Sequence, residues 1–182
     1  MQIDLIQTKS KKNPSRIRIM CTSTGCIEYA PERYRNLGIE IIRVHVLFNG
    51  KDYKEGLDLD PVDFYRQLET IEDPKNHLPS AAMPDTEEIQ AAFEKAIREG
   101  YDEAVVLTLS SGLGGTWNKI RLIADDYANK LKIHVVDTRI TCFCEGLLAI
   151  KAAEWAQQGK SVETILREIQ WMRIYHIRPR GI

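Results

Sequence analysis

The chain has 182 residues, 43% of them hydrophobic and 28% charged, a composition typical of a globular domain that buries its own core and not of a disordered chain. Its 25 basic and 26 acidic residues give a net charge of −1, which argues against nucleic-acid binding because that function needs a strongly basic surface. No signal peptide and no apolar stretch of about 18 residues is visible, so we expect a cytoplasmic protein that is not embedded in a membrane.

The predicted elements begin after a flexible N-terminal arm, residues 1–16, which has no apolar periodicity. A strand is predicted from residue 17 to about residue 24, because apolar residues alternate there before three small hydroxyl residues. The most β-branched run of the chain predicts a second strand over 39–48. The Asn49-Gly50 pair behind it predicts a hairpin turn into a short returning strand over 51–54.

Two helices are predicted in the middle of the chain. The Asp60-Pro61 pair supplies an N-cap and a first-position proline for a helix that ends near Thr70. Asp85 begins a capping box for a second helix, which stops before Gly100. The segment between the two helices, 72–84, contains three prolines and is predicted to be a loop.

The second half of the chain alternates strands with helices. The predicted segments are strands at 103–110 and 132–137, a glycine-rich turn at 111–115, and helices at 116–131, 141–158 and 161–173. This alternation predicts an α/β fold, with a doubly wound, mostly parallel sheet, helices on both faces and a small antiparallel addition from the hairpin. The domain is expected to span 17–175 and to be followed by an irregular tail, 176–182.

Small and hydroxylated residues follow the predicted strands at 22–24 and 110–116, and a third such segment, 80–84, precedes a helix. Ligands of an open parallel sheet bind where the strands end. The glycines of 110–116 let backbone amides converge at a helix N-terminus, which favours an anion. The segment lacks a nucleotide-binding motif and has no Arg or Lys before Lys119, so a carboxylate fits better than a phosphate. A tight capped turn without a ligand is the alternative.

Catalytic and metal sites have little support in the sequence. No histidine shows a motif that relates it to the serines of the glycine-rich turn, which argues against a serine hydrolase. Cys21 and Cys26 form a C-x4-C pair, and Cys142 and Cys144 form a C-x-C pair that is tight for zinc. In a cytoplasmic chain we interpret the four cysteines as buried or partly buried free thiols, and we predict no catalytic residue, metal site or cofactor.

The order of these motifs resembles the DegV family of bacterial fatty-acid-binding proteins, from about residue 17 to residue 168. The most specific motifs are YKEGLD at 53–58 and SSGLGGT at 110–116, which is similar to the family's S-S-G-L-S-G-T. The resemblance implies a two-domain protein that buries one long-chain fatty acid and is not an enzyme. In some members the acid is presented to a fatty-acid kinase. Since the chain ends near where the second domain would begin, we expect that domain to be absent.

The resemblance also implies which residues hold the ligand's carboxylate. The donor serine of the turn falls on Ser111, and the threonine of the family's T-S-Q-P segment falls on Ala81, so that one donor is lost unless Ser80 replaces it. The candidate fatty-acid-binding residues are Ser23, Ser80, Ala81, Ser110, Ser111, Gly112 and Gly114.

The lost donor and the absent second domain predict weakened binding and an exposed apolar face that a homodimer could cover. Two alternatives remain open. One is a small α/β enzyme that acts on an anionic substrate at the glycine-rich turn. The other is a structural remnant that binds no ligand.

Overall fold

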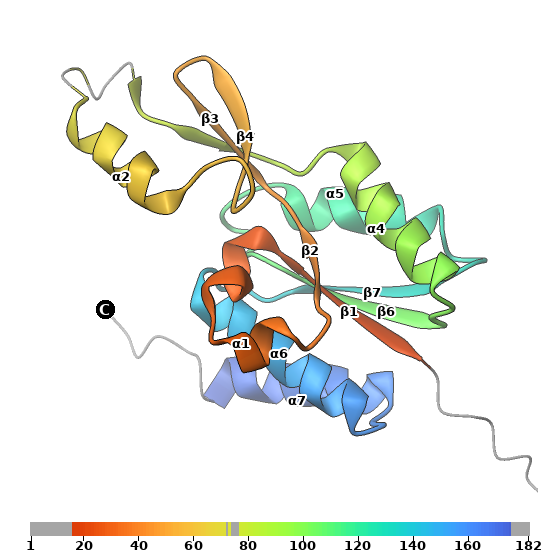
Figure 1. Cartoon of the computed structure of the whole chain (residues 1–182). Coiled ribbons are helices and arrows are strands. Elements are labelled where there is room, and N and C mark those ends of the chain that lie inside the picture. Colours follow the sequence, from red (N-terminus) through yellow and green to blue (C-terminus); the bar gives the residue numbers. More distant parts are fainter. Residues whose placement is uncertain (1–15, 72, 74–76, 176–182) are drawn as a thin grey trace, which may run out of the picture.

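The computed structural model describes residues 16–71, 73 and 77–175 (Figure 1). The predicted N-terminal arm, apart from Arg16, and the predicted tail, 176–182, lie outside these residues. Arg16 is joined to the fold, because its amide donates to the Asp102 carboxylate at 2.8 Å and its carbonyl accepts from the Asp102 amide at 2.9 Å.

The main sheet has four parallel strands in the order β2-β1-β6-β7. They are β1 (Ile17–Thr22), β2 (Glu40–Ile42), β6 (Glu103–Thr108) and β7 (Lys132–Asp137). Helices cover both of its faces, as Figure 1 shows. The helices and short 3-10 turns are η1 (Ser23–Gly25), η2 (Ile27–Tyr29), α1 (Glu32–Arg35), α2 (Pro61–Glu69), α4 (Thr86–Arg98), α5 (Thr116–Asp125), α6 (Phe143–Gln157) and α7 (Val162–Tyr175). The predicted doubly wound α/β fold is confirmed.

The alternation of side chains along the central strands builds two cores. Ile19 of β1 and Leu107 of β6 face one way and pack with apolar residues of α6 and α7, such as Leu148 and Ile165. Their neighbours on the same strands face the other way and pack with α4 and α5. Because successive strand residues point to opposite faces, these nearly continuous apolar runs require helices on both sides of the sheet.

The β-branched run 39–48 is not one strand, which corrects the prediction. β2 stays in the main sheet, whereas β3 (His45–Phe48) enters a second, antiparallel sheet of order β4-β3-β5, with β4 (Lys51–Lys54) and β5 (Ser80–Ala82). The hairpin is therefore no addition to the main sheet. The run breaks where the Val44 amide donates to the Ser23 hydroxyl at 3.0 Å, because that amide is then unavailable to a neighbouring strand.

The turn of the hairpin is as predicted. Asn49 and Gly50 have φ angles of 51° and 70°, and the two-residue turn that fits strand twist needs positive φ at both positions. The predicted loop 72–84 is wrong at β5, whose register pairs Ala81 with Val46. Two alanines carry no strand signal of their own, and the strand forms because the edge of β3 offers unpaired backbone groups.

The helix ends follow local hydrogen bonds. The Asp60 carboxylate accepts from the amides of Val62 and Asp63 at 2.9 and 3.0 Å, which confirms this N-cap. The Asp85 side chain makes no capping bond, so the predicted capping box is wrong. α5 ends six residues earlier than expected, at Asp125 instead of residue 131.

A close backbone approach fixes the start of α6 against η1. A Cβ atom at Gly146 would lie 2.0 Å from the carbonyl oxygen of Gly25, so a side chain cannot be accommodated there without moving the backbone. This contact places the first turn of α6, including Glu145, against the end of β1.

We predict that Gly146→Ala lowers the free energy of unfolding by about 2 kcal/mol or more, although alanine is the better helix former, because the new methyl group overpacks against a backbone atom. Chemical denaturation measures the change. Gly114→Ala is the matched control, since nothing lies within 4 Å of a Cβ at that position. Equal stability of the two variants would contradict the close approach.

Candidate functional site

The carboxyl ends of β1, β6 and β7 are tied together by buried threonines. The Thr22 hydroxyl accepts from the Leu109 amide at 3.2 Å, and the Thr138 hydroxyl donates to the Thr108 carbonyl at 2.7 Å. These three threonines are fully buried. The edge at which ligands of such sheets bind is therefore rigidly held.

The glycine-rich turn starts at this edge and leads into α5. The Ser110 amide donates to the Ile140 carbonyl at 2.8 Å, and the Ser110 hydroxyl oxygen accepts from the Gly112 amide at 3.2 Å. The amides of Gly114 and Thr116 donate to no other residue in the part of the chain that the structure describes. The start of α5 thus presents free N–H groups and the positive end of the helix dipole to an anion.

Ser111, the predicted carboxylate donor, is bound to a carboxylate of the chain itself. Its hydroxyl donates to Asp137 at 2.6 Å and its amide at 3.1 Å. Burial alone would raise the pKa of Asp137, but these two bonds, the Arg139 amide and the Arg139 charge outweigh it, and the pKa lies below its ordinary value. Asp137 therefore holds the single hydroxyl hydrogen of Ser111.

Two other predicted donors have their hydroxyl hydrogens free. Within the described residues, the hydroxyls of Ser110 and Ser80 donate no hydrogen bond; Ser110 is half-buried and Ser80 is exposed. Ala81 lies exposed in β5 and offers only a methyl group. A hydrogen bond from Ser110 is strengthened by the bond that its oxygen accepts from Gly112.

The segment 80–84 lies beside the glycine-rich turn. The Met83 sulfur would be 2.9 Å from a Cβ at Gly115, and the Lys119 ammonium donates to the Pro84 carbonyl at 2.6 Å. Two of the three predicted segments, 80–84 and 110–116, are thus brought together across the two sheets.

The third predicted segment, 22–24, is hydrogen-bonded to Glu145 of α6. The carboxyl group of Glu145 accepts hydrogen bonds from the hydroxyl of Thr22 and, at 2.8 Å, from that of Thr24, while the Cys21 thiol lies 3.5 Å away. Its side chain is 0% exposed. Burial raises the pKa of Glu145 to about 7 although the Thr22, Thr24 and Cys21 bonds lower it.

Ser23 is likewise bound to a carboxylate. Its hydroxyl donates to Glu55 at 2.7 Å. Arg43 donates to the Glu55 carbonyl at 2.7 Å and to Glu28 at 2.8 and 2.5 Å. The YKEGLD stretch, which contains Glu55, is therefore anchored beside the end of β1.

Sequence reasoning missed both Glu145 and Glu55. An acidic residue in the first turn of an otherwise apolar, alanine-rich helix was the available signal for Glu145, since a helix that is apolar on all sides is buried. Glu55 gave no such signal, because its partner lies 32 residues away in sequence.

The four cysteines are free thiols. Cys21 is buried and Cys26 half-buried, as predicted, but Cys142 and Cys144 are exposed, so the prediction is wrong for that pair. Cys142 and Cys144 lie at the start of α6, beside the carboxyl ends of the strands, and their side chains face solvent there. Among the described residues, no group of three His, Cys, Asp or Glu side chains could hold a metal ion.

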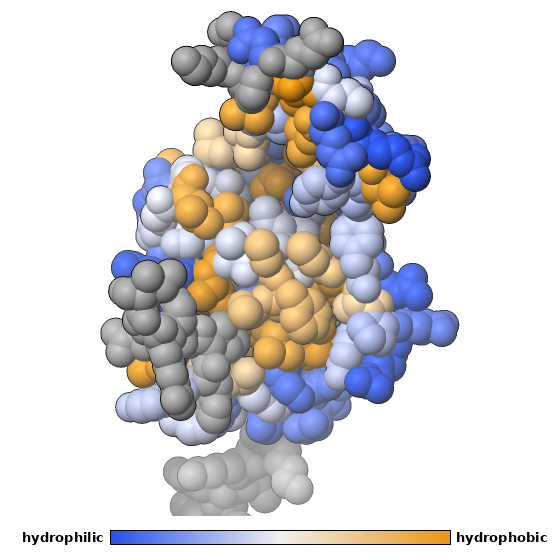
Figure 2. Space-filling view, turned by 90° about the vertical axis from the view of Figure 1, so that its left-hand side faces the viewer, coloured by the Kyte–Doolittle hydropathy of each residue, from blue (hydrophilic) through white to orange (hydrophobic). Residues whose placement is uncertain are grey.

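Hydrophobic residues gather on the face that the carboxyl ends of the strands point to (Figure 2). Exposed large side chains from the segments at this edge include Met83, Leu113 and Phe143, with exposures of 45%, 64% and 46%. An apolar face beside free amide and hydroxyl donors suits a ligand that has both a long apolar part and an anionic end. Among the described helices, none is both long and apolar enough to cross a membrane.

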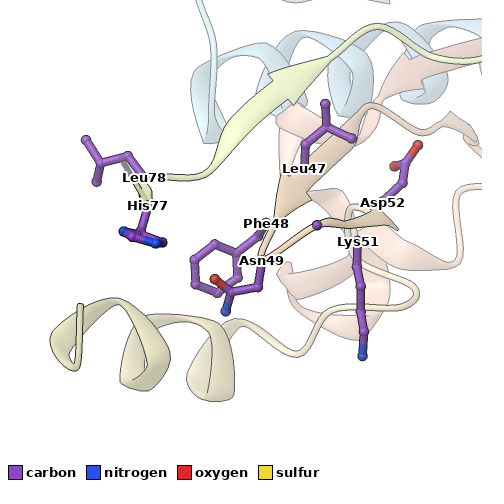
Figure 3. A pocket seen from close by; sticks show the side chains of 8 residues that line it. Leu47, Phe48, Asn49, Lys51, Asp52, His77 and Leu78 are labelled. Atoms are coloured by element: carbon purple, nitrogen blue, oxygen red, sulfur yellow. The ribbon is translucent and has the colours of Figure 1, made fainter. Parts of the chain in front are cut away.

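A cavity of about 540 Å³ lies elsewhere, at the tip of the β3–β4 hairpin. Figure 3 shows Phe48 and Asn49 on the side of the hairpin nearer His77 and Leu78, while Leu47 points the other way. This cavity shares no residue with the glycine-rich turn. The free donors at the sheet edge, and not this cavity, define the candidate site.

The sequence model of one protein family, described as "Uncharacterised protein, DegV family", matches residues 16–175. Protein DegV of Bacillus subtilis is 30% identical over 152 residues, which make up 82% of this chain and 52% of that protein. A DegV domain-containing protein of Listeria innocua is 30% identical over 147 residues, or 80% of this chain and 50% of that protein. The chain thus spans about half the length of the curated relatives it matches.

Solved structures of other proteins are similar to this chain in fold. The crystal structure of DegV, a fatty acid binding protein from Bacillus subtilis, has a TM-score of 0.76 and 29% identity and covers 88% of this chain and 54% of that one. A stearic acid-binding protein from Eubacterium ventriosum has a TM-score of 0.70 at 21% identity, covering 85% of this chain and 52% of that one, and supports the fold alone.

We predict that Ser111→Ala raises the pKa of Asp137 and lowers the free energy of unfolding at pH 7 by about 1 kcal/mol, because a charged group loses a hydrogen bond. A lowered carboxyl pKa adds stability that is present above the unfolded pKa, about 3.9, and lost as pH falls through the folded pKa. The stability difference should therefore shrink below about pH 4. Carboxyl NMR titration and denaturation measure both effects.

Ser110→Ala is the control, because the Ser110 hydroxyl contacts no carboxylate of the described residues. An Asp137 pKa that stays unchanged in Ser111→Ala would show that the hydroxyl bond contributes nothing to it.

Proposed function

The chain belongs to the DegV family, and on that premise we propose that it binds one long-chain fatty acid at the carboxyl edge of its main sheet, without acting as an enzyme. The observation that carries the proposal is the pair of free amides at the start of α5, Gly114 and Thr116, beside an exposed apolar face. The apolar face suits the hydrocarbon tail, and the amides suit the carboxylate.

In this proposal the head group is held mainly by Ser110 and the amide of Gly114, with Ser80 approaching from β5. Gly112 assists indirectly, since its amide donates to the Ser110 hydroxyl oxygen and leaves the hydroxyl hydrogen free for the ligand. Ser111 donates a hydrogen bond to the ligand only if its hydroxyl turns away from Asp137. Ala81 contributes a methyl contact.

Ser23 has a supporting role in the proposal. Its hydroxyl oxygen accepts from Val44 and its hydrogen goes to Glu55, so it holds the neighbouring segment in place instead of contacting the ligand.

We propose that binding by this chain is weak. About fourteen methylenes at about 0.8 kcal/mol each supply roughly 11 kcal/mol when fully buried, and an open face buries only a part of them. That part must also offset the immobilisation of the ligand. A homodimer that covers the apolar face would recover some of this burial.

The partners follow from the same proposal. A carboxylate held at an exposed turn stays accessible to a second protein, which supports presentation of the bound acid to a fatty-acid kinase.

The four free thiols agree with a cytoplasmic location, where thiols stay reduced.

Native mass spectrometry of the purified chain with stearic acid tests the proposal and reports the oligomeric state. We expect a complex with one acid per chain, and a double Ser80→Ala, Ser110→Ala variant should bind on the order of a hundredfold more weakly, since each bond to a charged group contributes about 1.5 kcal/mol.

Methyl stearate is the matched control ligand, because it keeps the tail and removes the charge. Equal binding of the ester and the acid would contradict a carboxylate site. A chain that binds neither ligand would support the structural remnant.

A further inference from the structure

Glu145 is a buried acid without a basic partner. Among the described residues, the side chains that donate hydrogen bonds to it are the hydroxyl and thiol groups of Thr22, Thr24 and Cys21. No Lys, Arg or His side chain of the described residues forms an ion pair with it. Charges that are fully buried are normally paired, so this carboxyl group has an unusually small preference for its ionised form.

The titratable groups that face Glu145 add no positive charge. They are Cys21 from β1, Cys26 from the junction of η1 and η2, and Glu55 from the segment after β4. Burial is the largest cause of the raised pKa of Glu145, about 7, and the Glu55 charge raises it further. The dipole of α6, in whose first turn Glu145 lies, opposes this.

Glu145 is also connected to the proposed ligand site. The Thr22 hydroxyl that donates to Glu145 accepts from the amide of Leu109. Leu109 directly precedes Ser110, which begins the glycine-rich turn. A ligand carboxylate at this turn and the Glu145 carboxylate therefore share one sheet edge, where no Lys, Arg or His side chain of the described residues pairs with Glu145. Two like charges in such surroundings favour protonation of one of them.

We propose that fatty-acid binding by this chain is linked to the uptake of one proton, and that Glu145 is the group that takes it up. The inference rests on the proposed function. The fatty-acid anion enters from solvent with one proton, the proton stays on the Glu145 carboxyl group, and the charge of the sheet edge is unchanged by binding.

The direction of the pH dependence follows from linkage. An anionic ligand raises the pKa of Glu145 above its value in the free chain, and reciprocally a protonated Glu145 raises the affinity for the anion. Below the free pKa the proton is already present, and affinity does not change with pH. Above it, affinity falls up to tenfold per pH unit until the pKa of the complex is reached.

The test measures the affinity for a fluorescent long-chain fatty acid between pH 6 and pH 9, from about one pH unit below neutrality to about two above it. For the natural chain we expect constant affinity at the acidic end and, above neutrality, a loss of up to about tenfold for each pH unit until the pKa of the complex is reached. Glu145→Gln keeps the size of the side chain and, like the protonated acid, has one oxygen that accepts and one group that donates, but it cannot ionise. It should bind at all these pH values as the natural chain does at the acidic end.

Glu154→Gln is the matched control, because Glu154 lies on the same helix and pairs with Lys151 at 2.7 Å on the surface. It should keep the natural pH profile. Calorimetry in buffers of different ionisation enthalpy counts protons directly, and it should find about one proton taken up by the natural chain above neutrality and none by Glu145→Gln. Even if Glu145→Gln fails to fold, the count on the natural chain tests the uptake of the proton, and carboxyl NMR titration of the natural chain with and without ligand tests whether Glu145 takes it up.

Binding of the fatty acid without proton uptake, or an unchanged pH profile in Glu145→Gln, would overturn the inference and leave the proposed function standing. No binding by the natural chain at any pH would overturn both. The two failures are therefore distinguishable.

Discussion

The need to satisfy buried hydroxyl groups where three parallel strands end is the constraint on which the site depends. Thr22, Thr108 and Thr138 are fully buried there, and an unpaired polar group in such a place is costly. Their bonds fix the ends of β1, β6 and β7 relative to one another. The glycine-rich turn leaves from this fixed edge, so its free amides have a defined position before any ligand arrives.

The chain's own carboxylates use most of the hydroxyls at this edge. Asp137 holds Ser111, Glu55 holds Ser23, and Glu145 holds Thr24. A ligand carboxylate therefore meets a region that already holds three carboxylates, and its available donors among the described residues are Ser110, Ser80 and backbone amides. Amides at a helix start attract an anion without adding a titratable group. A proton that is taken up at this edge therefore binds to one of its carboxyl groups.

Patterns that are local in sequence predicted the fold well, and long-range contacts account for what was missed. The alternation of apolar strands with amphipathic helices, the Asn49-Gly50 turn and the Asp60 cap each act within a few residues, and each is confirmed. The break of the run 39–48 depends on Ser23, which is distant in sequence. Glu145 was missed for the same reason, since the hydroxyls that bind it lie more than 120 residues away.

The open apolar face makes the charge balance at the head group more important for the affinity. In a fully enclosed site, burial of the hydrocarbon tail supplies roughly 11 kcal/mol for about fourteen methylenes, and a change at the carboxylate of about 1.4 kcal/mol per pH unit is a small part of the total. Where an exposed face buries only part of the tail, the same change becomes a large share of what remains after immobilisation. A buried acid that has no basic partner among the described residues, beside such a face, therefore has more influence on whether the ligand stays bound than the same acid would have in a closed cavity.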